Sequence, residues 1–248
     1  MNMTTATSAT RSPATGRFAP GQTLLFDADD TLWENNIYFE RAIASFISFL
    51  NHKEYTAAEV REQLNHHERA TIQAQGYGLQ SFRQSLVNCF EELSTVPVTP
   101  EKHRQIVSFV QAIAEQEIEL LPGVAETLEE LSENHNIYLV TKGDLLEQTD
   151  KLTRSGLGLY FSGVEVLAEK HPEAYRGLVE KHSFDPATTW MIGNSPRSDI
   201  NPSLAAGLHA VFIPHDHTWV LEHETVNEAP PNQRLLQLKS IAELADIF

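Results

Sequence analysis

The sequence predicts an α/β protein, a doubly wound, Rossmann-like parallel sheet that carries an inserted all-helical segment. From Gln22 onward, short apolar runs alternate with stretches of helical periodicity. The runs are four to six residues long and end in polar or small residues, which is typical of strands buried on both faces. One interval, between the first two runs, is far too long for a crossover helix.

The predicted strands and helices follow one another as βα units. The strands are expected at residues 23–28, 136–141, 163–168, 189–194 and 209–214. Amphipathic helices are expected at residues 123–135, 144–158, 172–184 and 199–208, where Gly or Asn marks the ends. Such a series folds into a doubly wound sheet with helices on both faces.

The long interval separates Asp27 from Thr141 by 114 positions, where a crossover needs only about a dozen residues. Its contents predict four amphipathic helices, at residues 36–50, 56–75, 81–93 and 101–120. Because it follows the first strand, this bundle should hang over the carboxyl edge of the sheet, where ligands bind in such folds. We therefore expect a core domain (residues 21–35 and 119–248) and a cap domain (residues 36–118).

Composition limits the classes of partner. The chain has 18 Lys and Arg against 34 Asp and Glu and no basic stripe, which argues against nucleic acid. No apolar run approaches the roughly 18 residues of a membrane-spanning helix. The single cysteine, Cys89, excludes an internal disulfide, suits the cytoplasm, and is expected to be buried. The first 20 residues, rich in Ser, Thr and Ala without an acid, are expected to be a disordered tail rather than a targeting signal.

Three carboxylates, Asp27, Asp29 and Asp30, directly follow the first apolar run. Their mutual repulsion must be offset, and a bound cation would do so. Asp27 and Asp29 lie two positions apart where the chain leaves the sheet, so one acid can attack a substrate while the other transfers protons. The alternative is an aspartate cluster that only caps the following helix. We expect Asp30 to bind backbone amides.

Polar groups also follow the second and third predicted strands. The hydroxyl of Thr141 and the backbone amides of Lys142 and Gly143 form an arrangement that can hold phosphate oxygens. Lys170, before a turn that contains proline, can supply a positive charge. Neither signal is strong alone. A single lysine, in particular, is usually a solvated surface residue.

The fourth predicted strand ends in a loop where Asn194, Ser195 and Asp199 present oxygens to a hard cation such as Mg²⁺. Thr141 and Lys170 are 29 positions apart, and so are Lys170 and Asp199, which is one βα unit each. The carboxyl ends of successive parallel strands meet at one sheet edge. The sequence therefore predicts that all these groups share a site.

With these motifs, "DADDT", Thr141, Lys170 and "GNSPRSD", the chain resembles the haloacid dehalogenase superfamily of aspartate-nucleophile phosphohydrolases over roughly residues 22–215. The resemblance implies that Asp27 is the nucleophile and forms an aspartyl-phosphate, and that Asp29 is the general acid and base. The predicted insertion resembles the helical cap of the type that this superfamily places between its first and second motifs.

The resemblance also implies the remaining roles. Thr141 and the amides after it would hold the transferred phosphoryl group, and Lys170 would neutralise the nucleophile and the phosphate. Mg²⁺ would be bound by the carboxylates of Asp27 and Asp199 and the backbone carbonyl of Asp29. Asn194 would assist through water, although many relatives have Asp at that position.

The expected activity is Mg²⁺-dependent hydrolysis of a small phosphorylated metabolite. Asp29 disfavours carbon–halogen cleavage, because dehalogenases of the superfamily lack an acid at that position. A phosphomutase and a non-catalytic interaction protein are the alternatives. Tyr77, between two glycines in a break of the predicted bundle, is a candidate for substrate binding, and a plain connector between the helices is the alternative. The sequence identifies neither the phosphate ester nor the oligomeric state.

Overall fold

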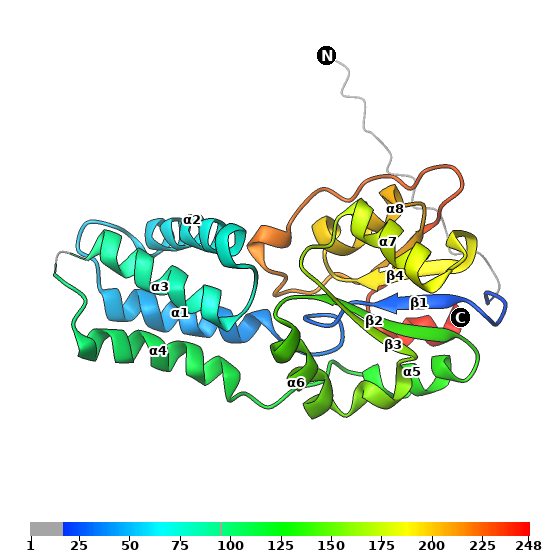
Figure 1. The fold of residues 1–248 in the computed structure, drawn as a ribbon, viewed down its shortest axis with the longest axis horizontal. Coiled ribbons are helices and arrows are strands. Elements are labelled where there is room, and N and C mark those ends of the chain that lie inside the picture. The colour runs from blue at the N-terminus through cyan, green and yellow to red at the C-terminus, as the bar shows by residue number, and fades with distance from the viewer. Residues whose placement is uncertain (1–16, 95) are drawn as a thin grey trace, which may run out of the picture.

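A six-stranded parallel sheet forms the centre of the molecule in the computed structural model, which describes residues 17–94 and 96–248 (Figure 1). The strand order is β3-β2-β1-β4-β5-β6. The strands are β1 (Thr23–Phe26), β2 (Asn136–Lys142), β3 (Gly163–Leu167), β4 (Thr189–Gly193), β5 (His209–Phe212) and β6 (Leu235–Gln237). The doubly wound prediction is confirmed. The sequence did not predict β6, a three-residue edge strand too short to show a pattern.

The strands are buried on both faces, as their apolar composition predicts. In β1, Leu24 and Phe26 belong to one apolar cluster, and Leu25, between them, belongs to a second cluster on the opposite face. In β4, Trp190 and Met191 divide between the same two clusters. This alternation is the two-residue period of a strand, and it shows that each face of the sheet has its own core.

Helices cover both faces of the sheet. Figure 1 shows α5 (Val124–Ser132) and α6 (Leu145–Ser155) on one face, and α7 (Pro172–His182) and α8 (Asn201–Ala205) on the other. A single π-helical turn, η3 (Pro196–Ile200), precedes α8. The short 3₁₀ helices are η1 (Leu157–Tyr160), η2 (Pro186–Thr188), η4 (Val220–Glu222) and η5 (Ile241–Asp246).

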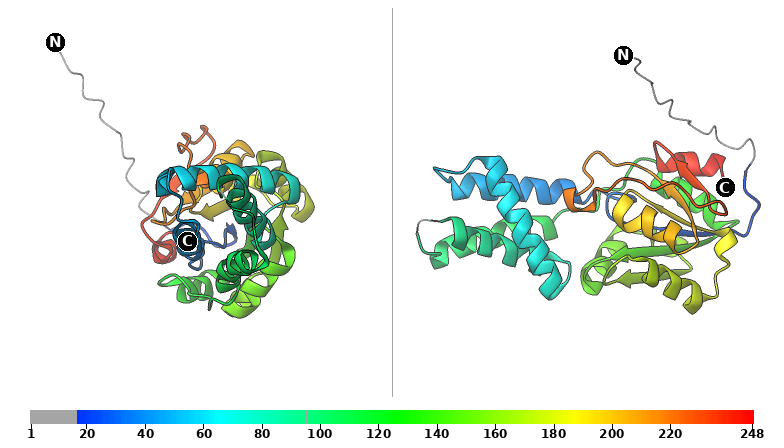
Figure 2. Two further views of the ribbon diagram at one scale, coloured as in Figure 1. Left: turned by 90° about the vertical axis from the view of Figure 1, so that its left-hand side faces the viewer. Right: turned by 90° about the horizontal axis from the view of Figure 1, so that it is seen from above.

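The insertion consists of α1 (Asn36–Leu50), α2 (Ala57–Gln75), α3 (Leu79–Leu93) and α4 (Pro100–Ala114). It has an apolar core of its own, which includes Phe46, Leu64, Leu86, Ile106 and Cys89. The expected burial of Cys89 is confirmed. A reciprocal capping box between Thr56 and Glu59 starts α2. In Figures 1 and 2 the insertion lies to one side of the sheet, at the end toward which β1 points.

The chain enters and leaves the insertion through two adjacent segments. The amide of Glu34 donates to the carbonyl of Glu119 (N to O, 2.9 Å), and the amide of Leu121 donates to the carbonyl of Leu32 (2.9 Å). These hydrogen bonds hold residues 119–121 beside residues 32–34 and outside any helix. The last helix of the insertion, α4, therefore ends at Ala114 instead of reaching residue 120 as predicted. The separate core of the insertion supports the proposed division into a core domain (21–35 and 119–248) and a cap domain (36–118).

The predicted disordered tail, residues 1–20, includes residues that are packed against the core. Residues 1–16 lie outside the described residues, but Phe18 packs against Trp190 (ring centroids 4.7 Å apart) and Phe248 (5.2 Å). An aromatic side chain buries enough apolar surface to hold this segment on the sheet.

Among the described helices, none combines the length and the apolar character that crossing a bilayer requires.

Candidate active site

The site begins where β1 ends. The amide of Asp27 donates to the carbonyl of Ile192 (2.9 Å), so Asp27 continues the ladder for one residue. The amides of Thr31 and Leu32 then return to the carbonyl of Ala28 (3.2 and 2.8 Å), which turns the chain sharply. The Asp27 carboxylate is thereby placed in a cleft at the carboxyl edge of the sheet.

The ammonium of Lys170 joins the two buried carboxylates of the site. Its Nζ lies 2.5 Å from Oδ1 of Asp27 and 2.7 Å from Oδ1 of Asp199. Lys170 follows β3, and Asp199 belongs to η3 after β4, so three strand ends meet at this point. The predicted convergence of Asp27, Lys170 and Asp199 is what the structure shows.

Charge and burial oppose each other in this cluster. Burial, together with the nearby carboxylate of Asp27, raises the pKa of Asp199. Burial alone would lower the pKa of Lys170, but the charges of Asp199 and Asp27 outweigh it and raise that pKa. One ammonium therefore serves two buried carboxylates, and the cluster keeps a net negative charge when both are ionised.

This donor set fits a divalent cation. Asn194 is buried beside the cluster, and the hydroxyl of Thr31 can donate its one proton either to Oδ1 of Asn194 (3.3 Å) or to Oδ2 of Asp27 (3.1 Å). Oδ2 of Asp199 accepts from the amide of Ser195 (2.9 Å). Two carboxylates and an amide oxygen are the hard oxygen ligands that Mg²⁺ takes.

Asp29 faces a different partner from Asp27. Its carboxylate oxygens lie 2.7 and 2.9 Å from Nζ of Lys151 on α6, and they also accept from Nε2 of Gln148 (3.0 Å) and Nε1 of Trp33 (2.7 Å). Burial would raise the pKa of Asp29, but the charge of Lys151 and these hydrogen bonds lower it below its ordinary value. In this conformation Asp29 is therefore held as a carboxylate and turned toward α6.

Asp30 caps the first helix of the insertion. It adopts the left-handed region (φ 61°), and its Oδ1 accepts from the amides of Asn35 (2.9 Å) and Asn36 (3.0 Å). The expectation that Asp30 binds backbone amides is confirmed. The helix-capping alternative thus holds for this one member of the aspartate cluster.

The end of β2 and the residue after it supply fewer free groups than their sequence suggests. Thr141 is buried and lines the cleft. The amide of Gly143, however, donates to the carbonyl of Leu167 (3.3 Å), so it is not free to hold a phosphate oxygen in this conformation. The ammonium of Lys142 lies 2.5 Å from Oε1 of Glu222 and 2.8 Å from the hydroxyl of Ser198.

Tyr77 reaches from the insertion to the rim of the cleft. Its hydroxyl donates to Oε2 of Glu169 (2.7 Å), and burial raises its pKa to about 12, which keeps it a donor. Its ring lies under the ammonium of Lys142 (4.5 Å) and edge-on to Trp219 (centroids 6.4 Å apart). The structure therefore places Tyr77 at the cleft, and its role in substrate binding stays a prediction.

Several residues of the cleft were not singled out from the sequence, among them Glu222 from the segment after β5, Glu68 from α2 and Lys151 from α6. Glu222 accepts from the hydroxyls of Ser195 (2.6 Å) and Ser198, so it braces the loop that holds Asp199. Nothing near Glu222 in the sequence indicates this contact. Glu68 carries a weak signal, because it interrupts the apolar face that Leu64 and Ile72 define.

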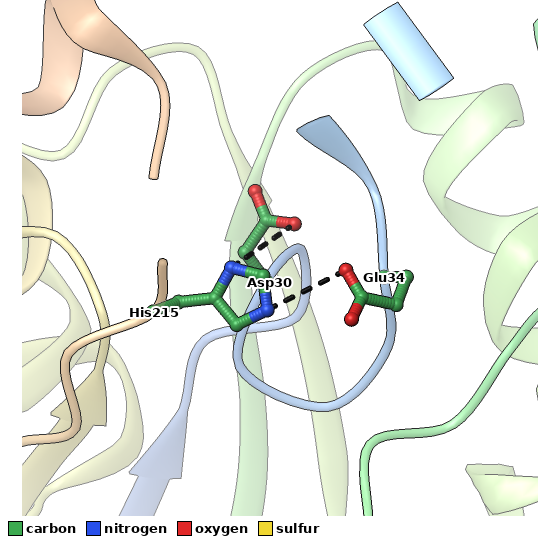
Figure 3. A group of neighbouring side chains, drawn as sticks. All are labelled: Asp30, Glu34 and His215. Carbon is green, nitrogen blue, oxygen red and sulfur yellow. Dashed lines mark ion pairs between the residues drawn. The ribbon is translucent and has the colours of Figure 1, made fainter. Parts of the chain in front are cut away.

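A second group of possible ligands lies beside the turn (Figure 3). His215 is placed between Asp30 and Glu34, with Nδ1 3.9 Å from Oδ1 of Asp30 and Nε2 3.4 Å from Oε2 of Glu34. Oδ1 of Asp30 is already committed to the backbone amides of the α1 N-terminus. We therefore interpret this group as an ion pair that fixes the loop after β5, and not as the metal centre.

The cleft has about 1000 Å³ of space, open solvent included, between the sheet edge and the insertion. Asp27, Thr141, Lys170, Asn194 and Asp199 line the sheet side. The insertion contributes Phe39 of α1, Glu68 of α2 and Phe82 of α3. A substrate in this cleft would touch both parts of the molecule.

Residues 22–207 match the family model of haloacid dehalogenase-like hydrolases. This chain belongs to that family. It is 26% identical to a haloacid dehalogenase-like family hydrolase from Xanthomonas campestris, with a TM-score of 0.77 over 92% of this chain and 95% of that one. The fold also matches the putative HAD-hydrolase YfnB from Bacillus subtilis, bound to magnesium, at 21% identity and a TM-score of 0.63 over 92% and 98% of the two chains.

Among curated proteins, the pyrimidine 5'-nucleotidase PynA from Streptococcus pneumoniae is 29% identical over 138 residues. The match covers 53% of this chain and spans 56% of PynA. An L-2-haloacid dehalogenase from Xanthobacter autotrophicus shares the fold at 15% identity, with a TM-score of 0.62 over 91% of this chain and 97% of that one. The chain is thus a member of a hydrolase family, and its fold is also found in a dehalogenase.

Proposed function

We propose that the protein is a Mg²⁺-dependent phosphomonoester hydrolase that acts on a small phosphorylated metabolite through an aspartyl-phosphate. The observation that carries this proposal is the position of Asp27, whose carboxylate lies in the cleft with Nζ of Lys170 2.5 Å away. The same ammonium holds Asp199 at 2.7 Å. A carboxylate nucleophile held beside a cation suits attack on an anionic phosphate.

In the proposed first step, an oxygen of Asp27 attacks phosphorus while the bond from phosphorus to the ester oxygen breaks. The leaving oxygen takes the bonding electrons and receives a proton from Asp29. To do so, Asp29 must turn away from Lys151 and gain a proton. In the second step Asp29, now a carboxylate, takes a proton from water, which attacks the phosphoryl group and restores Asp27 with release of phosphate.

Lys170 and Thr141 assist through charge and hydrogen bonding. The ammonium of Lys170 offsets the negative charge of Asp27 and of the incoming phosphate, which would otherwise repel each other. The hydroxyl of Thr141 would donate to a phosphoryl oxygen. The backbone amides of Lys142 and Gly143 are proposed as further donors, which requires the Gly143 amide to leave the carbonyl of Leu167.

Mg²⁺ would be held by the carboxylates of Asp27 and Asp199 and the backbone carbonyl of Asp29, with Asn194 assisting through water. When bound, it supplies positive charge that stabilises the transferring phosphoryl group. The burial of Asp199 near Asp27, and the net negative charge that Lys170 leaves on the two carboxylates when both are ionised, support this assignment.

Nucleoside 5'-monophosphates are the first candidates for the substrate, because PynA is a pyrimidine 5'-nucleotidase. The presence of Asp29 favours an oxygen leaving group, which needs a proton, over the halide that a dehalogenase releases. Burial of the lone Cys89 suits the reducing cytoplasm, which we propose as the location.

The test is release of inorganic phosphate from p-nitrophenyl phosphate and from a panel of phosphomonoesters, with Mg²⁺ and with EDTA. We expect Mg²⁺-dependent turnover in the wild type and its loss in Asp27→Asn. Glu62→Gln, an exposed change on α2, is the matched control and should keep full activity. Equal turnover by Asp27→Asn and wild type would exclude Asp27 as the nucleophile, and transfer of phosphate to a second hydroxyl without release would indicate a mutase.

A further inference from the structure

A buried carboxylate without a partner lies on the insertion side of the cleft. Glu68, on α2, is 5% exposed, and its Oε2 has no hydrogen-bond partner among the described residues. It lines the same cleft as Asp27. A buried carboxylate normally has a cation or several donors, so this exception needs a cause.

The nearby cations of α2 are engaged elsewhere. Both terminal nitrogens of Arg61 lie 2.8 Å from the carboxylate of Glu40, and its Nε donates to Oδ1 of Asn65 (2.9 Å). Arg69 approaches Glu62 instead, at 3.8 Å. Neither arginine donates a hydrogen bond to Glu68, and their charges only partly offset the cost of its burial. Burial is the main cause that raises its pKa to about 7.

The surroundings of Glu68 define what a ligand must look like. Phe39 of α1 and Phe82 of α3 line the cleft and pack edge to face, with ring centroids 5.0 Å apart. Ile72 lines the cleft one helical turn after Glu68, on the same side of α2. A flat, largely apolar group with a hydrogen-bond donor on its edge would fit between this apolar wall and the carboxylate.

We propose that Glu68 is a specificity residue that accepts a hydrogen bond from an N–H group of the leaving group, and that this leaving group is a nucleoside. The inference rests on the proposed phosphatase function of the same cleft. The phosphate lies at Asp27, and the base lies against Phe39 and Phe82 with its N–H edge toward Glu68. A sugar phosphate fits less well, because its many hydroxyl groups would face apolar rings that offer them no partner.

The decisive variant is Glu68→Met, which keeps the length of the side chain and removes the acceptor. We expect kcat/KM for uridine, cytidine and guanosine 5'-monophosphates to fall by about 10- to 100-fold, mainly through KM, because the base loses its partner. Turnover of p-nitrophenyl phosphate, whose leaving group offers no N–H, should stay within about twofold of the wild type. Glu62→Gln on the same helix is the control and should leave the turnover of both kinds of substrate unchanged.

Two results would overturn the inference. An equal fall for nucleotides and p-nitrophenyl phosphate in a Glu68→Met protein that melts as the wild type does would make Glu68 structural only. Unchanged nucleotide turnover would show that Glu68 does not contact the base. If the wild type hydrolyses no ester at all, the proposed function fails, and titration calorimetry with uridine 5'-monophosphate then decides the inference separately: weaker binding to Glu68→Met supports it, and equal or absent binding overturns it.

Discussion

Gly193 and Asp199 share one small space at the end of β4. A Cβ on Gly193 would lie only 2.8 Å from Cβ of Asp199 and would overlap its carboxylate. The absence of a side chain at Gly193 is therefore a condition for the position of Asp199, and it links the local sequence "IGN" to the proposed metal site.

Gly193→Ala should displace Asp199 and weaken Mg²⁺ binding. We expect the Mg²⁺ concentration for half-maximal activity to rise at least about tenfold, because a proposed ligand moves out of place. Gly177→Ala is the control, since an added Cβ there meets nothing within 4 Å and Ala favours the interior of α7. Activity titrated against Mg²⁺ measures the change, and an unchanged midpoint in Gly193→Ala would remove Asp199 from the metal site.

Lys170→Met should make stability depend strongly on Mg²⁺. The variant leaves the buried carboxylates of Asp27 and Asp199 without their shared cation, which should cost about 3 kcal/mol of unfolding free energy in EDTA. Added Mg²⁺ should recover more stability in the variant than in the wild type, since it binds only the folded state. Lys181→Met, an exposed change beside Glu165, is the control. Thermal melts with and without Mg²⁺ test this, and equal Mg²⁺ effects in all three proteins would contradict it.

Glu68→Gln should alter the pH dependence of stability. In the folded protein the pKa of Glu68 rises from its ordinary value of 4.5 to about 7, so its favourable contribution is complete below pH 4.5 and is lost as pH rises through about 7. Gln does not titrate. Relative to the wild type, the variant should therefore gain unfolding free energy between those pH values, on the order of 3 kcal/mol. Urea unfolding at several pH values measures the gain, and parallel curves would refute the raised pKa.

Tyr77→Phe should loosen the contact between the insertion and the sheet edge. The change removes the hydroxyl that donates to Glu169 and leaves the ring beside Trp219. We expect KM to rise about three- to tenfold with a smaller change in kcat, since a hydrogen bond to a charged group contributes about 1–2 kcal/mol. Tyr55→Phe, at an exposed tyrosine, is the control. Steady-state kinetics test this, and identical constants would mean that the contact does not affect substrate binding.

The part of the site that the sequence predicts is the part that the sheet determines. Asp27, Lys170 and Asp199 each follow a strand, and parallel order alone brings their positions to one edge. Residues 141–143 also lie at this edge because they end a strand. The hydrogen bond from the Gly143 amide to the Leu167 carbonyl depends on the register between β2 and β3, which the sequence does not indicate.

The other contacts of the site depend on how elements that are distant in the sequence pack against one another. The pairing of Asp29 with Lys151 requires α6 to lie over the turn after β1, and no local pattern encodes that distance. Glu68 looks like an ordinary helix acid until the insertion closes over the cleft. Glu222 becomes a brace only because the irregular segment after β5 folds back over η3. Such contacts arise from tertiary packing rather than from periodicity.

The paired segments at Leu32–Glu34 and Glu119–Leu121 have a consequence for how this molecule can change. Because the chain departs and returns at neighbouring points joined by backbone hydrogen bonds, the whole insertion can be replaced without moving the sheet. The contacts that hold Asp27 and Asp199, to Lys170 and to the Ser195 amide, lie within the core domain. Selection can therefore exchange the cover, and with it the preferred leaving group, while it leaves the inherited reaction untouched.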